Sequence, residues 1–232
     1  MQETSAANAG FIRASDQSLL IGFGDSISLE DHRRVGALLR LLEQQPIPGV
    51  RNLHPAYSSL LVVFDVLRMD HAELETRLRE YLARLDNMEA APRRSIEIPV
   101  CYDREFGLDC EDVAATCSMT QQDVITMHCS CEYMVYFLGF APGFAYLGDL
   151  PAGLEVPRLA VPRRMVPRGS VAIAGRQTAV YPLPTPGGWR ILGRTPLAMI
   201  TPEGDGTSLL RMGDLVRFAP ITREQFDKME RA

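Results

Sequence analysis

Lysine is nearly absent from this chain of 232 residues: Lys228 is the only lysine among 24 basic residues, and the others are arginines. The plainest interpretation is codon usage in the source genome, although arginine also suits bidentate recognition of carboxylates and phosphates better than lysine does. The chain also has no excess of basic residues, because its 29 acidic residues leave a formal net charge of −5. This balance argues against a general nucleic-acid binder, which needs excess basic side chains to neutralise phosphates.

Long apolar runs are also absent. None approaches the roughly 18 residues needed to cross a bilayer, so no membrane association is expected. Residues 1–11 lack the basic and apolar regions of a secretory signal. The five cysteines form no CxxC pair, and His128, Cys129 and Cys131 do not have the spacing of a zinc motif. We therefore expect no metal site, a cytoplasmic location, and reduced thiols that are buried and inert.

Motifs for several kinds of catalysis are missing as well. The chain has no GxxxxGK[ST] loop and no GxGxxG after a strand, so it does not bind ATP or a dinucleotide by those routes. Ser170 lies in GSVAI rather than in a GxSxG elbow, which gives weak support for a serine hydrolase. His128 and Glu132 would share a helix face if the helix continued and would then form an acid/base pair, but local carbonyls more often satisfy a helix-end histidine. The catalytic residues therefore stay unassigned.

The first 94 residues have the pattern of a small α+β domain. Residues 18–23 read as a strand, and Ser28 is placed to cap a helix that ends before Pro46. Two strands follow, at 50–54 and 58–65, and Asp70 is placed to cap a second helix. With 96–100 as a possible closing strand, this order predicts a ferredoxin-like unit. Residues 89–94 form the expected linker.

Residues 95–232 have a different pattern of expected helices and strands. Two short helices are expected, near 109–115 and 121–128, the second opened by a capping box between Thr120 and Asp123. Short β-rich runs separated by glycine and proline follow, and no further helix is expected before the C-terminal tail. This pattern favours a barrel or sandwich.

The segment from Arg158 to Arg194 concentrates positive charge. It contains no Asp or Glu, and it holds seven arginines, namely Arg158, Arg163, Arg164, Arg168, Arg176, Arg190 and Arg194. Such a basic, glycine-rich surface with interleaved aromatic residues suits an anionic small molecule or an acidic partner. The alternative is that most of these arginines are solvated or pair with acids from elsewhere in the chain.

A second candidate is the run LGFAPGFAYLG at 138–148. Three glycines, a proline and three aromatic residues are typical of a structured loop, and the glycines allow close backbone approach to a ligand. Phe140, Phe144 and Tyr146 are candidates for the wall of a pocket. Alternatively, they fill the barrel core.

Three runs resemble a known family. They are LGFAPGFAYLG (138–148), VPRGSVAIAGRQT (166–178) and YPLPTPGGWRILGRTP (181–196). They are similar to the family that contains the B subunit of bacterial 5-oxoprolinase, allophanate hydrolase subunit 1 and a sporulation-kinase inhibitor, and they lie nearest to the 5-oxoprolinase B subunit. The likeness extends over most of the chain. It implies an α+β N-terminal domain at 1–94 and a cyclophilin-like β-barrel domain at 95–232.

The resemblance also implies a function shared with partner chains. In this family, the 5-oxoprolinase subunits A, B and C together hydrolyse 5-oxo-L-proline to L-glutamate at the expense of ATP, so this chain is expected to be inactive alone. The lack of a nucleotide-binding motif in this chain agrees with a complex in which another subunit binds ATP. The substrate is expected beside Phe140, Pro142, Gly143, Arg163, Gln177, Thr178, Tyr181, Trp189 and Arg194, with an arginine holding the carboxylate. Relative to the expected family pattern, Arg168 adds bulk and Ala179 removes a glycine, which affects the shape of the pocket.

Two other functions are compatible with the same resemblance. One is a carboxyltransferase-like or allophanate-hydrolase-type subunit acting on urea-derived substrates, although the chain has no biotin-acceptor lysine outside the tail residue Lys228. The other is a binding-only regulator of a histidine kinase.

Overall fold

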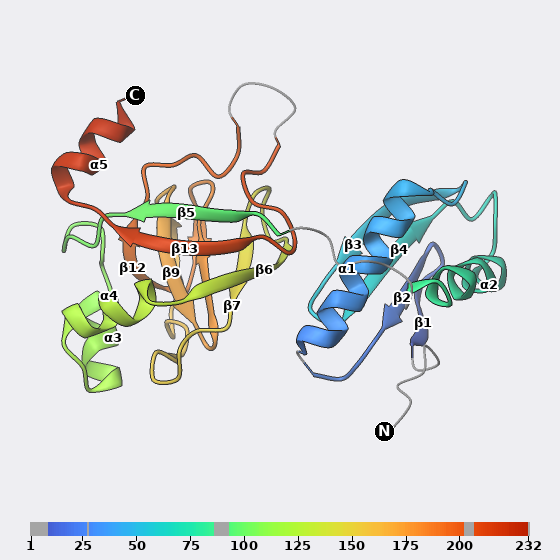
Figure 1. Cartoon of the computed structure of the whole chain (residues 1–232), viewed down its shortest axis with the longest axis horizontal. Coiled ribbons are helices and arrows are strands. Elements are labelled where there is room, and N and C mark those ends of the chain that lie inside the picture. Colours follow the sequence, from blue (N-terminus) through green and yellow to red (C-terminus); the bar gives the residue numbers. More distant parts are fainter. Residues whose placement is uncertain (1–8, 27, 86–92, 202–206, 232) are drawn as a thin grey trace. The chain divides into compact units, whose positions relative to one another are not determined.

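The structure is a computed structural model that describes residues 9–26, 28–85, 93–201 and 207–231 (Figure 1). The chain divides into two compact units, Met1–Pro92 and Arg93–Ala232. Most of the expected linker, residues 89–92, lies outside the described residues.

The first unit is a four-stranded antiparallel sheet with two helices. Its strands are β1 (Gly10–Ser15), β2 (Ser18–Gly22), β3 (Val50–Pro55) and β4 (Ser59–Phe64), in the order β1-β2-β4-β3. The helices α1 (Leu29–Gln44) and α2 (His71–Leu82) pack against the sheet and against each other. Strand β4 alternates between buried and half-buried residues, as expected for a strand with one face on a core.

Both helices of this unit begin where their capping residues predict. The Ser28 side chain accepts a hydrogen bond from the Asp31 backbone N–H at 3.0 Å, and Asp70 accepts one from the Glu73 N–H at 2.9 Å. Each cap satisfies an N–H group that has no partner within its helix. The predicted caps are confirmed.

The expected closing strand of this sheet belongs elsewhere. Residues 96–100 lie in β5 (Ser95–Val100), which pairs in parallel with β13 (Leu215–Pro220) in the second unit. The outer position beside β2 is instead taken by β1, which was not predicted. Five of the six residues of β1 are exposed, so its sequence carries no alternating apolar signal. The ferredoxin-like arrangement is therefore not confirmed.

The second unit is a nearly closed mixed β barrel. Its sheet has the order β12-β9-β10-β7-β6-β13-β5, in which β6 is Glu132–Leu138, β7 Ala145–Gly148, β9 Ser170–Ala174, β10 Gln177–Val180 and β12 Arg190–Arg194. The two edge strands meet just beyond β5, where Cys101 and Arg194 exchange backbone hydrogen bonds of 2.8 and 2.9 Å. The barrel anticipated from the short β-rich runs is thus present.

Three helices and a small ribbon complete this unit. The helices are α3 (Cys110–Cys117), α4 (Gln121–Cys129) and α5 (Arg223–Glu230). Thr120 and Asp123 form the predicted capping box of α4. In Figure 1, α3 and α4 lie together at one end of the barrel. Strands β8 (Arg163–Val166) and β11 (Thr185–Gly187) form a separate two-stranded ribbon.

Side chains alternate between the two faces of the barrel sheet. Val171 and Ile173 of β9 point into the main core, together with Leu192 of β12. Ala172 and Ala174 of β9 instead belong to a second cluster, which also contains Val166 of the β8–β11 ribbon. Because successive side chains of a strand point to opposite faces, this second cluster lies on the outer face of the barrel.

The barrel core contains an ionisable side chain that is wholly enclosed, His128 at the end of α4. Its ring nitrogens contact the hydroxyl of Tyr102 at 2.9 Å and the hydroxyl of Thr178 at 3.0 Å. Thr178 donates to the carbonyl oxygen of Ala172 at 3.2 Å, so it accepts from His128 Nε2–H, and Nδ1 accepts from Tyr102. The histidine is therefore satisfied by side chains, not by local carbonyls as expected. Glu132 pairs with Arg217, so the possible acid/base pair with His128 does not form.

Burial of His128 predicts loss of stability in mild acid. Desolvation lowers its pKa from 6.5 to about 3, so the unfolded chain takes up this proton first as the pH falls below 6.5. The stability linked to this group is complete above that pH and declines as the pH falls toward 3. We expect the free energy of unfolding, measured by urea denaturation, to fall by about 1.4 kcal/mol more in the wild type than in His128→Gln between pH 7.5 and 5.5. The exposed His54→Gln variant is the control and should match the wild type.

Candidate functional site

A pocket of about 230 Å³ lies at the outer cluster of the barrel, bordered by the β8–β11 ribbon. Its walls come from the loop between β6 and β7, from β7, and from the segments that surround β8 and β11. The lining residues are Phe140, Phe144, Tyr146, Arg158, Pro162, Tyr181, Pro186, Gly187, Gly188 and Trp189.

Phe144 is the centre of the aromatic wall. Its buried ring meets four others edge to face, with centroid distances of 5.3 Å to Phe140, 5.0 Å to Tyr146, 5.2 Å to Tyr181 and 5.7 Å to Trp189. This geometry places the positive edge of one ring on the negative face of the next. Phe144 and Tyr146 therefore pack in the outer cluster rather than in the barrel core, while Phe140 is 65% exposed at the rim.

Two glycines make this wall possible. Gly143 has φ +76°, and a Cβ there would lie 2.5 Å from the side chain of Ile200. A Cβ on Gly187 would lie 2.3 Å from the hydroxyl oxygen of Tyr181. Glycine is needed where a chain adopts a left-handed conformation or where another group approaches closely. The sequence pattern of glycines among aromatic residues is thus explained by packing around the pocket.

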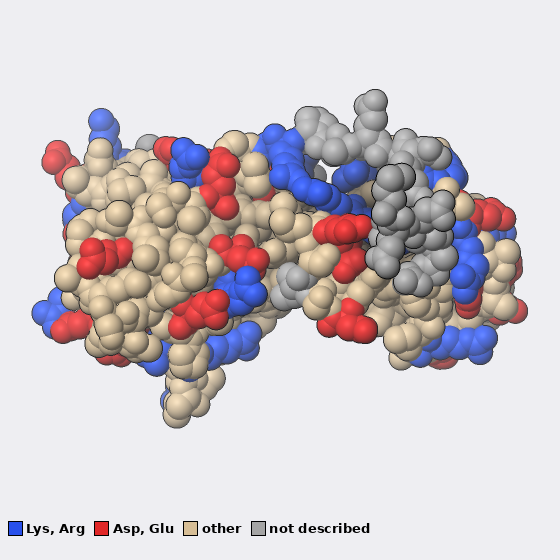
Figure 2. Space-filling model, turned by 60° about the horizontal axis from the view of Figure 1, so that its bottom comes forward, with Lys and Arg blue, Asp and Glu red and all other residues tan. Residues whose placement is uncertain are grey.

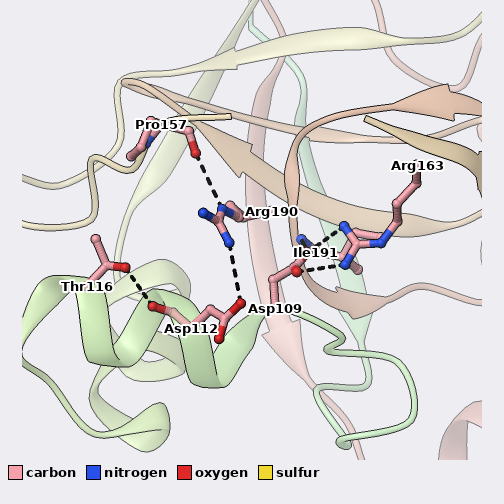
Figure 3. A network of polar contacts seen from close by, with 7 residues as sticks. All are labelled: Asp109, Asp112, Thr116, Pro157, Arg163, Arg190 and Ile191. Carbon is pink, nitrogen blue, oxygen red and sulfur yellow. Dashed lines mark hydrogen bonds and ion pairs between the residues drawn. The ribbon is translucent and has the colours of Figure 1, made fainter. Parts of the chain in front are cut away.

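A buried ion pair fixes one side of the pocket. Arg163 of β8 donates two hydrogen bonds to Asp109, at 2.9 and 2.7 Å, and the Ile191 backbone N–H of β12 donates a third at 2.7 Å (Figure 3). The Asp109 side chain is only 3% exposed. Since Asp109 directly precedes α3, this carboxylate joins α3, β8 and β12, and Arg163 is not available to a ligand.

Most arginines of the basic segment have acidic partners. The pairs are Arg163–Asp109, Arg176 with Asp149 and Glu155, Arg190–Asp112 and Arg194–Glu230. Figure 2 shows acidic and basic side chains interspersed over one face of the molecule. Within the described ranges, Arg158, Arg164 and Arg168 have no carboxylate within ion-pair distance. Pairing therefore holds for four of the seven, and the three without an acidic partner are exposed to solvent.

Arg158 is the unpaired arginine that lines the pocket. Its guanidinium carbon lies 5.8 Å from the centroid of the Trp189 ring. Its backbone is held on both sides: Leu159 N–H donates to Gly188 at 2.7 Å, and Arg190 donates to the carbonyl oxygen of Pro157 at 3.4 Å. A cation on a fixed backbone beside aromatic rings is suited to an anion.

Two tyrosine hydroxyls also belong to the pocket. Burial raises the pKa of Tyr146, and the charge of Arg158 only partly opposes this effect. Burial likewise raises the pKa of Tyr181, against the lowering by a hydrogen bond with the Trp189 backbone and by Arg158. Both phenols are therefore neutral near pH 7 and are able to donate hydrogen bonds.

The structure brings together only part of the predicted site. Phe140, Tyr181 and Trp189 line the pocket, and Pro142 and Gly143 lie in the loop that carries Phe140. The other four predicted residues, Arg163, Gln177, Thr178 and Arg194, do not line it. Thr178 points into the barrel core toward His128, and Arg194 packs over Phe106 and Phe226 at the far end of β12.

Five lining residues were not among the predicted site and wall residues, namely Arg158, Pro162, Pro186, Gly187 and Gly188. Arg158 belongs to the recognised basic segment, but the sequence does not show which arginines are neutralised by distant acids. Gln177 is a further polar residue of interest, because its buried Nε2 has no hydrogen-bond partner in the part of the chain described.

The described residues contain neither a metal site nor a membrane-spanning helix. No set of three His, Cys, Asp or Glu side chains is placed to hold a metal ion. None of the helices there has the length and apolar character required to cross a membrane.

Comparison with known proteins places this chain in a family. Residues 10–210 match the family model described as "Carboxyltransferase domain, subdomain C and D". The chain belongs to this family. Three bacterial relatives, each named as the B subunit of 5-oxoprolinase, are 36–43% identical to it. The one from Bacillus subtilis (strain 168) is 39% identical over 221 residues, which cover 91% of this chain and 92% of the relative. The resemblance inferred from the three glycine-rich runs is confirmed.

Solved structures agree with this carboxyltransferase-domain assignment. The crystal structure of TTHA0988 is 37% identical, with a TM-score of 0.78, and covers 89% of this chain. This chain spans only 40% of that one. Urea carboxylase of Kluyveromyces lactis, at 20% identity and a TM-score of 0.78 over 98% of this chain, shares the fold.

The Asp109–Arg163 pair predicts that the substitution Asp109→Asn strongly lowers the stability of this carboxyltransferase domain. Asp109→Asn removes the negative charge opposite a half-buried arginine, so we expect the free energy of unfolding to fall by about 2–3 kcal/mol in urea denaturation. The control is Asp112→Asn, which breaks the exposed pair with Arg190 and should cost about 0.5 kcal/mol or less. Trp189, the only tryptophan, should also become easier to quench with acrylamide in Asp109→Asn before global unfolding begins. Equal stability of the two variants would contradict the role assigned to Asp109.

Proposed function

We propose that this chain is the B subunit of a 5-oxoprolinase complex and that its pocket binds 5-oxo-L-proline. Relatives of nearly the same length carry this name. In the proposed complex, the 5-oxoprolinase subunits A and C join this chain, and the complex hydrolyses the lactam to L-glutamate with consumption of ATP. A stable amide in a five-membered ring requires such coupling.

The observation that carries the proposal is the position of Arg158. It is the only charged residue that lines the pocket, and it has no acidic partner among the described residues. A bound carboxylate would supply that partner and accept two parallel hydrogen bonds from the guanidinium. The aromatic walls then suit a small ring. Neutral urea offers no charge to Arg158, so the pocket disfavours urea itself, although a urea-derived carboxylate such as allophanate would also pair with this arginine.

The pocket also explains why this chain would need partners. Its lining residues include no carboxylate, histidine, serine or cysteine that could act as nucleophile or base. One arginine is a poor match for a triphosphate, which usually requires several cationic or backbone N–H donors. We therefore assign substrate binding and orientation to this chain, and ATP chemistry to another member of the complex.

The rim of the pocket offers a surface for such a partner. Val161, next to the lining residue Pro162, is 81% exposed. Met165, on β8, is 61% exposed. Arg164 and Arg168 lie in the same stretch without acidic partners among the residues described. We propose that this mixed apolar and basic strip contacts an acidic, apolar surface of the C subunit, which would close the open side of the pocket.

Binding by the isolated chain tests the role of Arg158. In Arg158→Gln we expect the Kd for 5-oxoproline, measured by Trp189 fluorescence, to rise about tenfold or more because a charge-assisted pair is lost. Arg164→Gln is the matched control, since it removes an unpaired arginine that does not line the pocket, and its Kd should stay within twofold of wild type. Equal affinity of Arg158→Gln and wild type would refute the substrate site.

Reconstitution tests the assembly. The chain co-expressed with subunits A and C should show 5-oxoproline-dependent ATP consumption, whereas the chain alone should show none. Arg164→Glu with Arg168→Glu should lower co-purification of the C subunit at least severalfold, because like charges then oppose each other. The control Arg176→Glu, outside the strip, should co-purify normally. A complex that forms but consumes no ATP with 5-oxoproline would overturn the proposed activity.

A further inference from the structure

The hydroxyl of Tyr146 is a polar group of the pocket. Within the described part of the chain it has no hydrogen-bond partner, although its ring lines the pocket. The Tyr181 hydroxyl, by comparison, is bonded with the Trp189 backbone, and those of Tyr102 and Tyr133 are bonded to His128. This hydroxyl is not among the wholly buried polar atoms that lack a partner, so it is accessible to a ligand or to water.

The ring of Tyr146 is held firmly by its neighbours. Phe137 stacks on it with a centroid distance of 4.5 Å and an interplanar angle of 16°. The edges of Phe144 and Trp189 approach at 5.0 and 5.9 Å. Contacts from three rings fix the direction of the hydroxyl, so a ligand would meet a preorganised donor and lose little affinity to ordering it.

Arg158 and Tyr146 approach the same ring. Arg158 lies 5.8 Å from the centroid of Trp189, and Tyr146 lies 5.9 Å from it. The charge of Arg158 also lowers the pKa of Tyr146, against burial, which shows that the two groups are electrostatic neighbours. Both residues line the same pocket beside Trp189, so one small ligand in it is able to face the guanidinium and the hydroxyl together.

We propose that Tyr146 donates a hydrogen bond to the carbonyl oxygen of the ligand while Arg158 holds its carboxylate, so that the pocket selects small cyclic amides bearing a carboxylate. This inference rests on the proposed function and names the group that recognises the amide. In 5-oxoproline, the carbonyl and the carboxylate-bearing carbon flank the ring nitrogen, which matches two separate recognition groups. Tyr146 is thus a specificity-determining residue.

Three ligands distinguish the contact made by Tyr146 from the contact made by Arg158. The complete ligand is 5-oxoproline, 2-pyrrolidinone has the lactam without the carboxylate, and cyclopentanecarboxylate has the carboxylate without the lactam. Their affinities for the full chain are measured by NMR titration, which tolerates weak binding. Tyr146→Phe keeps the ring packing and removes only the donor, and Tyr81→Phe, whose hydroxyl donates to Gln45 in the first unit, is the matched control.

We expect the two variants to weaken different pairs of ligands. Tyr146→Phe should weaken 5-oxoproline and 2-pyrrolidinone about five- to tenfold, the effect of one hydrogen bond, and leave cyclopentanecarboxylate unchanged. Arg158→Gln should weaken 5-oxoproline and cyclopentanecarboxylate and leave 2-pyrrolidinone unchanged. Equal loss for all three ligands in Tyr146→Phe, or no loss, would overturn the role of Tyr146 while leaving the site itself in place. If the wild type binds none of the three, both the inference and the proposed substrate site fail.

Discussion

The pocket depends on a single carboxylate that reaches three elements. Asp109 accepts two hydrogen bonds from Arg163 of β8 and one from the Ile191 backbone of β12, directly before α3 begins. Without this anchor, the β8–β11 ribbon would have only its own short pairing and the cluster around Val166 to hold it on the barrel. The ribbon supplies Gly187, and the turn after it supplies Trp189, so the ion pair indirectly sets the position of both. Arg163, which was predicted to contact the ligand, instead holds the ribbon in place and does not itself line the pocket.

The same barrel sheet serves two purposes because its side chains alternate. The inner face is filled by large aliphatic residues, and His128 is accommodated there only because Tyr102 and Thr178 satisfy both ring nitrogens. The outer face carries alanines at 172, 174 and 179, whose small side chains leave room above the sheet. The rings of Phe144 and Tyr181 occupy that space and form the base of the pocket wall. A glycine at residue 179, as the family pattern led us to expect, would leave slightly more room beneath them.

Local signals in the sequence were sufficient for the helices but not for the strand partners. Ser28, Asp70 and Thr120 cap their helices because each satisfies N–H groups only three residues away. Strand β5 has the same apolar alternation whichever sheet it joins, and its pairing with β13 spans more than a hundred residues. The aromatic half of the site followed from two glycine-rich runs, at 138–148 and 181–196. Its charged half did not, because Asp109 lies far from Arg163 in sequence, and nothing local distinguishes a neutralised arginine from a free one.

Pairing of most arginines leaves a single uncompensated cation at the pocket. A segment with seven unpaired cations would attract phosphates, nucleic acids and polyanions alike. In the folded chain, Arg163, Arg176, Arg190 and Arg194 are opposed by carboxylates, and only Arg158 among the lining residues keeps an uncompensated charge. One cation beside neutral phenols and aromatic rings matches a ligand with one negative charge and a small ring. That lining also holds no carboxylate, histidine, serine or cysteine, which agrees with the proposed division in which this chain binds the substrate and another subunit supplies the ATP chemistry.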